Sequence, residues 1–450
     1  MSMSTCDCKF CVCISLIKRR KLMPVTISKN QMNFIKDGKP FFYLADTCWS
    51  AFTNIHAADW EYYLQYRKRQ GFNVLQINIL PQWDASASDL QYIPYACDTS
   101  GKYQFDKINE DYFIHAREMC EKAKEYGFEL ALVLLWCNYV PGTWANNMIP
   151  NNTMPFDRVK EYIGVVHKTF SHLQPMYMIS GDTDLEQEIS KSYYIEASDE
   201  IRRLAPTCLQ TLHVRGRLMK IPDNLINRID FYMYQSGHNA KIENKCMSYC
   251  IAEYFMRNYP IKPLINAEPC YEQMGYSQGM YGRFHAFDIR RAAWQSLLSG
   301  ACAGITYGAA GIYSWHTYGK EFDKKIGEGF DTPHPWHFAL HYPGAWDYSS
   351  IARIMNIYNI QELWSRQDIL VNKTEEIRIA TTKGEKKVLI YVPENTIVKL
   401  QLTLSCKDTV TIIDLQSRHQ EYGNIYYENG ECCIGMHLFG HDALYIIERE

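Results

Sequence analysis

The chain has 450 residues, of which 47% are hydrophobic and 22% are charged, and this balance excludes an intrinsically disordered protein. Lys and Arg total 47 against 50 for Asp and Glu, so the net charge of −3 argues against nucleic acid as the main partner. The longest apolar run, residues 130–137, is far shorter than the roughly 20 residues of a membrane-spanning helix, and no membrane partner is expected.

The amino-terminal segment is set apart by four cysteines in the sequence STCDCKFCVC. They are Cys6, Cys8, Cys11 and Cys13. We expect residues 1–23 to be a disordered leader, or to lie upstream of a true start at Met23, although four thiolates this close could instead chelate zinc or copper. The basic residues at 18–21 follow the apolar stretch, which is not the order of a secretory signal. A cytoplasmic protein is therefore expected.

From residue 41 onward, short apolar runs alternate with longer amphipathic stretches. The strand-like runs are residues 41–49, 72–80, 129–136, 176–181, 209–214, 230–235, 263–268 and 305–315. The helix-like stretches between them are residues 58–70, 110–126, 156–172, 194–204, 245–258 and 286–298. Eight such strands predict an α/β fold in which residues 24–365 form a (β/α)8 TIM barrel. No GxGxxG motif follows the first strand, which argues against a nucleotide-binding sheet.

The pattern changes after residue 365. Short strand-like runs now follow one another without a helix, at residues 377–381, 388–392, 397–404, 410–414, 425–427, 432–436 and 444–447. In the third of these runs apolar and polar residues alternate, which is typical of a strand with one solvated face. Residues 366–450 are therefore predicted to form a small antiparallel β-sandwich domain that supports the barrel.

Two acids stand at the ends of opposed barrel strands. The active site of a (β/α)8 barrel lies at the carboxyl ends of its strands, where Asp182 follows the fourth run and Glu268 ends the seventh. Paired carboxyl groups that flank a substrate can cleave a glycosidic bond, because one protonates the leaving oxygen while the other attacks or activates water. Asp184 and Glu272 lie nearby and compete for these roles.

Other polar and aromatic side chains at the strand ends are candidates for contact with substrate. They are Asp46, Trp49, Asn78, Trp136, His213, Tyr234, Gln235, His238, Glu272 and Trp315. Indole faces at the barrel mouth would pack on the apolar faces of sugar rings. Structural roles remain open for Asp46 as a helix cap, for the two histidines as hydrogen-bonded core residues and for Tyr234 as a core residue or a partner of the strand-seven carboxylate.

Several segments, in chain order, resemble the apiosidase-like glycoside hydrolases, family 140. They are FYLADTCW at 42–49, GFNVLQ at 71–76, GD at 181–182, QSGH at 235–238, NAEPCYE at 266–272 and GIYSW at 311–315. The resemblance covers about residues 30–450 and implies a (β/α)8 catalytic domain, a following β-sandwich and a retaining mechanism. The resemblance would make Asp182 the acid/base and Glu268 the nucleophile. At the acid/base position much of that clan has Glu preceded by Asn, whereas this chain has Asp preceded by Gly. Ala45 also replaces a glycine that is usual in the strand-one motif.

These observations predict a glycoside hydrolase with an oligosaccharide partner. The resemblance implies an apiosyl or other pentosyl linkage in a plant cell-wall-type oligosaccharide, and no metal or organic cofactor is expected. The oligomeric state stays open. Two other functions remain: a carbohydrate-binding barrel without turnover, against which the two carboxylates argue, and a metal-dependent barrel hydrolase that would use His213, His238 and Asp182.

Overall fold

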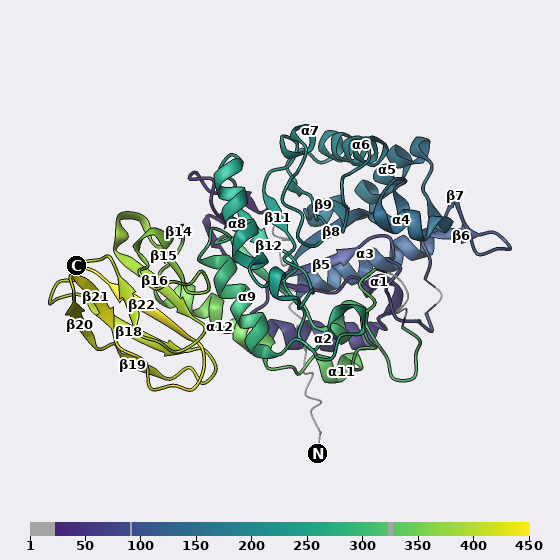
Figure 1. Ribbon diagram of the computed structural model, residues 1–450. Helices are drawn as coiled ribbons and strands as arrows, with labels where there is room; N and C mark the ends of the chain where they lie inside the picture. Colours follow the sequence, from purple (N-terminus) through teal and green to yellow (C-terminus); the bar gives the residue numbers. More distant parts are fainter. Residues whose placement is uncertain (1–22, 91, 323–326) are drawn as a thin grey trace, which may run out of the picture.

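The computed structural model describes residues 23–90, 92–322 and 327–450 (Figure 1). The cysteine-rich segment predicted to be a disordered leader lies outside these residues, apart from Met23. All cysteines in the described ranges are free thiols, most of them buried. Within the same ranges no helix is both long enough and apolar enough to cross a membrane.

Eight parallel strands form the barrel, as predicted. They are β4 (Tyr43–Thr47), β5 (Val74–Asn78), β8 (Glu129–Trp136), β9 (Met176–Gly181), β10 (Gln210–Thr211), β11 (Tyr232–Tyr234), β12 (Leu264–Asn266) and β13 (Gly304–Tyr307). Their spatial order is β10-β9-β8-β5-β4-β13-β12-β11. Two hydrogen bonds of 2.8 Å link the end strands, one from Asp230 N to Gln210 O and one from the Thr211 hydroxyl to Phe231 O. The sheet is therefore a nearly closed barrel, which confirms the predicted fold class.

Helices cover the outside of the barrel (Figure 1). The longer ones are α2 (Ala57–Arg69), α3 (Glu110–Glu125), α5 (Val159–Phe170), α6 (Glu188–Leu204), α8 (Met247–Asn258), α9 (Ala286–Leu297) and α12 (Gly344–Ile357). The short ones are α1 (Ala51–Asn54), α4 (Trp144–Met148), α7 (Asp223–Ile226), α10 (Ala310–Tyr313) and α11 (Trp336–Ala339). In α5 the buried residues Val159, Ile163, Val166 and Phe170 recur every three or four positions, so one stripe of the helix packs against the core.

The eighth strand is shorter than the apolar run of residues 305–315 predicts. β13 ends at Tyr307, and the chain then turns into α10. Gly308 permits this close turn, because a β-carbon there would overlap the ring of Tyr271. A continuous apolar run does not separate a buried strand from a buried helix, so the sequence could not mark this boundary.

Two small β-elements flank the barrel. β1 (Thr26–Ile27), β2 (Phe34–Lys36) and β3 (Lys39–Phe41) form an antiparallel sheet. The ring of Phe34 packs against Tyr43 and Phe231, at the amino ends of β4 and β11, so this sheet covers the end of the barrel opposite the predicted site. A hairpin of β6 (Tyr95–Cys97) and β7 (Tyr103–Ile108) extends from the body (Figure 1).

The last part of the chain forms two antiparallel sheets. One has the order β14-β15-β16-β22-β18-β19 and the other β17-β21-β20. Their strands are β14 (Trp364–Ser365), β15 (Arg378–Thr381), β16 (Lys387–Val392), β17 (Val398–Leu400), β18 (Thr409–Asp414), β19 (Gln420–Tyr422), β20 (Ile425–Glu428), β21 (Glu431–Ile434) and β22 (Ala443–Glu448). Buried side chains from both sheets, such as Ile390 and Ile434, share one apolar core, so the pair is a β-sandwich. Its first strand begins at residue 364, slightly before the expected boundary at 366.

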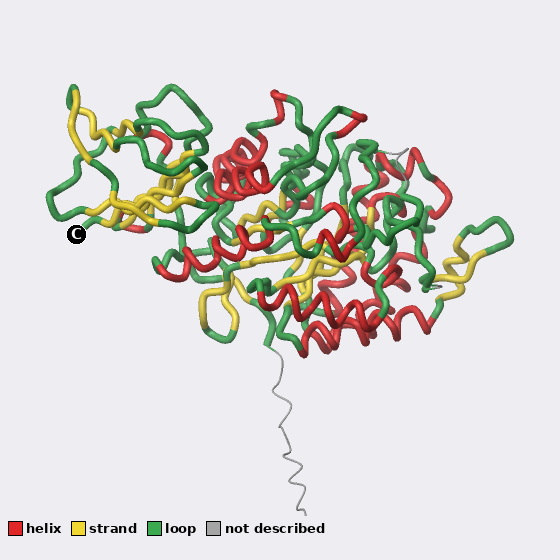
Figure 2. The backbone as a smooth tube through the Cα atoms, turned by 90° about the horizontal axis from the view of Figure 1, so that it is seen from below, coloured by secondary structure: helices red, strands yellow, loops and turns green. Residues whose placement is uncertain are grey.

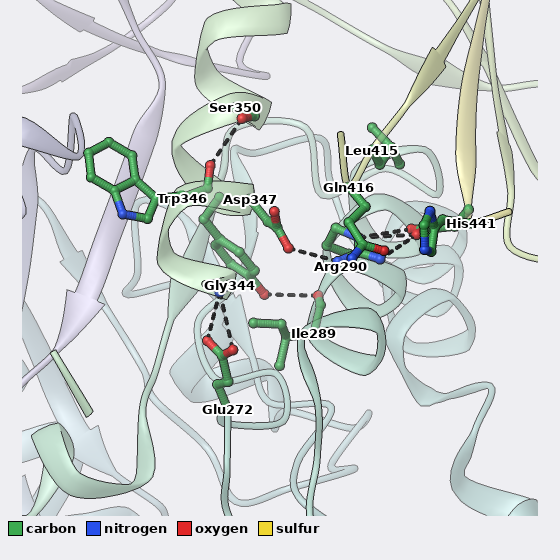
Figure 3. A network of polar contacts seen from close by, with 12 residues as sticks. Glu272, Ile289, Arg290, Gly344, Trp346, Asp347, Ser350, Leu415, Gln416 and His441 are labelled. Carbon is green, nitrogen blue, oxygen red and sulfur yellow. Dashed lines mark hydrogen bonds and ion pairs between the residues drawn. The ribbon is translucent and has the colours of Figure 1, made fainter. Parts of the chain in front are cut away.

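The sandwich lies beside α8, α9 and α12 of the barrel (Figures 1 and 2). Buried ion pairs between side chains join the barrel and the sandwich, and Arg290 of α9 is at their centre (Figure 3). Its guanidinium lies 2.8 Å from Asp347 of α12 and 2.5 Å from Asp442 of the sandwich. Arg418 of the sandwich contacts the other oxygen of Asp347 at 2.5 Å. The sandwich is thus fixed to α9 and α12.

Candidate active site

A cavity of about 830 Å³ opens at the carboxyl ends of the barrel strands. It contains six of the predicted site residues: Trp49, Trp136, Asp182, Gln235, His238 and Glu268. Several residues that the sequence analysis did not propose as substrate contacts also line it, among them Trp83, Trp144, Arg217, Tyr271, Tyr313, Glu328 and Phe330. The two predicted acids therefore share one cavity.

Glu268 lies between two imidazoles. Its Oε1 is 2.8 Å from Nε2 of His238, and its Oε2 is 3.1 Å from Nε2 of His213. All three side chains are buried, and they come from the ends of strands seven, six and five. The carboxylate is therefore held in place from two sides.

Backbone amides set the tautomers of both histidines. Nδ1 of His213 accepts a hydrogen bond of 3.2 Å from the N–H of Asp182, and Nδ1 of His238 accepts one of 3.2 Å from the N–H of Tyr271. A nitrogen that accepts carries no proton, so each neutral ring carries its proton on Nε2, which faces Glu268. Among the described residues no group of three or more His, Cys, Asp or Glu side chains is arranged to hold a metal ion, so His213, His238 and Asp182 do not form the ligand set of the metal-dependent alternative.

These contacts keep Glu268 ionised. Burial acts to raise the pKa of Glu268, but the hydrogen-bonding side chains of His213 and His238 outweigh it and lower the pKa to about 2. A carboxylate that remains unprotonated at neutral pH and faces a cavity can act as a nucleophile.

Asp182 adopts a strained backbone conformation that two side chains hold. Its φ is +50°, which is unusual for a residue other than glycine. Its N–H donates to His213, and its carbonyl oxygen accepts a hydrogen bond of 2.8 Å from Nε1 of Trp144. Strain of this kind persists where the surroundings over-determine the conformation, as they do at functional sites. His213 thus contacts the backbone of one acid and the carboxylate of the other.

The pKa of the Asp182 carboxyl group is shifted in the opposite direction from that of Glu268. Burial raises its pKa well above the usual range, and the charges of Glu268 and Asp84 raise it further, while Arg215 and Arg217 lower it less. A group that stays protonated beside an ionised partner can donate a proton in a reaction.

Aromatic rings form the floor of the cavity. Nε1 of Trp49 donates a hydrogen bond of 3.1 Å to the hydroxyl of Tyr271, and the rings of Trp49 and Trp136 lie 5.3 Å apart. Trp136 in turn stacks on His213 at 5.9 Å. This contiguous layer presents flat apolar surfaces beside Glu268.

Loops above the floor complete the cavity wall. Trp83 follows β5 and Trp144 begins α4, and their rings meet edge to face at 5.0 Å. Arg217, which follows β10, forms an ion pair of 2.7 Å with Glu328. The wall therefore contains both an indole pair and an ion pair.

Six predicted contact residues do not line the cavity: His213, which contacts Glu268, and Asp46, Asn78, Tyr234, Glu272 and Trp315. Asp46 is fully buried, lies 2.5 Å from Arg67 and accepts a hydrogen bond of 2.7 Å from Tyr63, so it is part of an internal ion pair. Asn78 is buried and donates to Gln82 at 2.6 Å. Tyr234 points to the helix layer, where its hydroxyl donates to Ser248 O at 2.7 Å.

Glu272 also faces away from the cavity. Its carboxylate accepts hydrogen bonds from the N–H of Gly344, at the start of α12 (Figure 3). It also accepts one of 2.7 Å from the hydroxyl of Tyr307. Asp184, the other competitor acid, is buried and accepts a hydrogen bond of 2.9 Å from the N–H of Trp144. Glu272 and Asp184 therefore both have structural partners. Of the four acids considered from the sequence, Asp182 and Glu268 are the two that line the cavity.

Trp315 is the clearest displacement from its expected place. Its indole is only 2% exposed and stacks on Trp336 with ring centroids 4.5 Å apart, behind the barrel wall. The prediction placed it at a strand end, but it follows α10. Tyr313, two residues earlier, lines the cavity instead.

Some residues of the cavity carried no signal in the sequence. Trp144, Arg217 and Glu328 lie in segments that follow three different strands, and only the fold brings them together. The Pro-Gly-Thr segment before Trp144 marks a loop, and an aromatic residue directly after it was the one available hint.

A (β/α)8 barrel whose mouth holds two carboxyl groups with opposite pKa shifts has the architecture of a glycoside hydrolase. The model of the apiosidase-like catalytic domain matches residues 28–362. The chain therefore belongs to the apiosidase-like family, and it is a glycosidase.

Solved structures share the whole architecture. A protein described as a glycoside hydrolase is similar with a TM-score of 0.76 and 20% identity, over 95% of this chain and 97% of that one. A glycoside hydrolase family 5 protein from Bacteroides vulgatus is similar with a TM-score of 0.75 and 20% identity, over 95% of this chain and 93% of that one. At this identity the likeness shows the fold. No curated protein sequence matches the chain.

Proposed function

We propose that this protein is a retaining glycosidase in which Glu268 is the nucleophile and Asp182 the general acid/base. The proposed substrate is an oligosaccharide of plant cell-wall type with an apiosyl or other pentosyl linkage, which rests on membership of the apiosidase-like family. The observation that carries the role assignment is the opposite tendency of two carboxyl groups in one cavity, with the pKa of Glu268 lowered and that of Asp182 raised.

In the first step a carboxylate oxygen of Glu268 attacks the anomeric carbon. The bond from that carbon to the leaving-group oxygen breaks, and the proton of Asp182 passes to this oxygen. The product is a glycosyl ester of Glu268 and a free alcohol group on the leaving sugar. Loss of the proton from Asp182 is favoured at this point, because the negative charge of Glu268 has been consumed.

In the second step water attacks the anomeric carbon. Asp182, now a carboxylate, takes a proton from the water while the ester bond to Glu268 breaks. The sugar leaves with its anomeric configuration retained, and both residues return to their starting protonation states. His213 and His238 stabilise the departing carboxylate, because their Nε2 atoms already face its oxygens.

The direct test compares wild type with Glu268→Gln and Asp182→Asn on a panel of 4-nitrophenyl pentosides and pentose-containing oligosaccharides. Loss of kcat by at least about 1,000-fold in Glu268→Gln is expected, since the amide is no nucleophile. Asp182→Asn should lose more activity on oligosaccharides than on nitrophenyl glycosides, whose leaving group needs little protonation. Undiminished turnover in both variants would refute the assignment.

Two further measurements separate nucleophile from base. A 2-fluoro glycosyl substrate should leave a sugar covalently attached to Glu268, detectable by mass spectrometry of the peptide. Proton NMR of the first product should show the anomeric configuration of the substrate. An inverted product would assign Glu268 the role of a base that activates water.

A further inference from the structure

Several buried polar atoms of the cavity lining have no hydrogen-bond partner within the described residues, and three of them belong to uncharged side chains. These three are Nε1 of Trp136, Oε1 of Gln235 and the hydroxyl of Tyr313. Their side chains are deeply buried, with residue exposures of 4%, 6% and 2%. The same three residues line the cavity that contains Glu268 and Asp182.

Unpartnered buried polar groups are rare in folded proteins because each costs about 1–3 kcal/mol. The fold does not require these polar groups. Backbone hydrogen bonds hold Gln235 and Tyr313 in place, and they would also hold an apolar side chain at either position. Arg217 N donates to Gln235 O at 2.8 Å, and Ser50 N donates to Tyr313 O at 3.1 Å. The three unpaired polar groups thus point to a ligand that supplies their hydrogen-bond partners.

The three residues surround the cavity from different strands. Trp136 ends strand three, Gln235 follows strand six, and Tyr313 ends the short helix after strand eight. The ring of Tyr313 lies 5.4 Å from that of Tyr271, and through Tyr271 and Trp49 it is continuous with Trp136. The negative charge of Glu268 contributes to the raised pKa of Tyr313, after burial and the charge of Asp84. The hydroxyl therefore belongs to the part of the cavity where Glu268 reacts.

We propose that Trp136, Gln235 and Tyr313 recognise the hydroxyl groups of the glycone, and that Tyr313 is a specificity-determining residue of the site. The inference rests on the proposed function, because it places the sugar that Glu268 attacks against these three atoms. The indole N–H donates to a sugar oxygen, the amide oxygen accepts from a sugar hydroxyl, and the phenol does either.

This arrangement defines the class of glycone. It requires a ring with at least two free hydroxyl groups, one that accepts and one that donates, so deoxygenated or fully substituted sugars are rejected. A site built to hydrogen-bond a substrate hydroxyl discriminates strongly against analogues that lack it, because its own buried groups then stay unpaired.

The test is Tyr313→Phe with Tyr43→Phe as its matched control. The hydroxyl of Tyr43 is also buried and without a partner in the described chain, but Tyr43 lies at the amino end of the barrel, away from the cavity. Tyr313→Phe should keep or raise the thermal midpoint and lower kcat/KM for the best 4-nitrophenyl pentoside on the order of 10- to 100-fold. Tyr43→Phe should leave kcat/KM unchanged.

Deoxy analogues of the same glycoside identify the hydroxyl involved. For one analogue, wild type should lose about as much kcat/KM as Tyr313→Phe loses on the intact sugar, and the variant should show no additional loss. Gln235→Met should show the same non-additivity with a different analogue.

The outcomes separate the two proposals. If wild type hydrolyses no glycoside, the proposed function fails. If wild type is active but Tyr313→Phe keeps full kcat/KM, or loses activity equally on every analogue, the inference about recognition is overturned while the proposed function stands. A lowered thermal midpoint in Tyr313→Phe, with unchanged discrimination among analogues, would show a structural hydroxyl and also overturn it.

Discussion

The indole of Trp136 packs directly on the α-carbon of Gly181, so that a β-carbon at position 181 would overlap ring atom Cε3. Gly181 precedes Asp182, and Trp136 forms part of the cavity floor. The two residues are paired in register on the neighbouring strands β8 and β9. The absence of a side chain before the proposed acid/base is therefore a requirement of the indole beside it.

Gly181→Ala should damage both the fold and the site. The added methyl group forces the indole or the strand to move, at a cost of about 1–3 kcal/mol, and displaces the surface that faces the substrate. We expect a lowered thermal midpoint and a large loss of kcat/KM. Gly164→Ala in α5 is the control, since its β-carbon would meet no described atom within 4 Å and alanine favours a helix. Equal behaviour of the two variants would contradict this relationship.

His238→Ala should move the acid limb of the pH profile upward. In the wild type Glu268 stays ionised down to about pH 2, because two imidazoles oppose the effect of burial. Without His238 the burial remains and one donor is lost, so the pKa of Glu268 rises and activity disappears at a higher pH. The measurement is kcat/KM against pH. His419→Ala, an exposed histidine of the sandwich, should leave the limb in place.

The alkaline limb should belong to Asp182. A general acid works while protonated, so activity is present below its raised pKa and is lost as the pH passes above it. On a nitrophenyl glycoside, whose leaving group needs little protonation, Asp182→Asn should retain measurable first-step activity that no longer falls on this limb. A limb that persists at the same pH in the variant would assign it to another group.

The fold was predictable because its signals are local and repeated. Buried runs such as that of β8 and amphipathic stretches such as that of α5 identify parallel strands and covering helices. The end of β13 was not predictable, because residues 305–315 are apolar whether they form strand or helix. This one boundary decided whether Trp315 or Tyr313 faces the cavity.

The candidate site was predictable in its acids and only partly in its surroundings. Asp182 and Glu268 were predicted from their positions at strand ends, and the structure places both in one cavity, while their catalytic roles stay a prediction. The engagement of His213 and His238 with Glu268 depends on ring orientations that backbone amides set across strands. Glu272 and Asp46 are also acids at strand ends, like Asp182 and Glu268, but each has a structural partner. The partner of Glu272 is Gly344, which is distant in sequence, and the partner of Asp46 is Arg67 on a covering helix.

Glu272 should make stability depend on pH in a direction unusual for a carboxylate. Burial raises its pKa from 4.5 to about 7, against the lowering effect of its bonds to Tyr307 and Gly344. The folded state therefore binds the proton more tightly, so its stability contribution is complete below about pH 4.5 and is lost as the pH rises through about 7. The unfolding free energy of wild type, relative to that of Glu272→Gln, should therefore decrease by about 3 kcal/mol as the pH rises over this range, measured by chemical denaturation. A constant difference would contradict the raised pKa.

The contact between barrel and sandwich should depend on Arg290 more than on any surface ion pair. Arg290 is 4% exposed, and its removal leaves the carboxylates of Asp347 and Asp442 buried with fewer donors. Arg290→Met should therefore cost about 3–5 kcal/mol of unfolding free energy, because uncompensated buried charge is expensive. Arg158→Met removes an exposed pair with Glu161 and should cost less than about 1 kcal/mol. If chemical denaturation shows similar small losses for both variants, the buried network does not hold the sandwich in place.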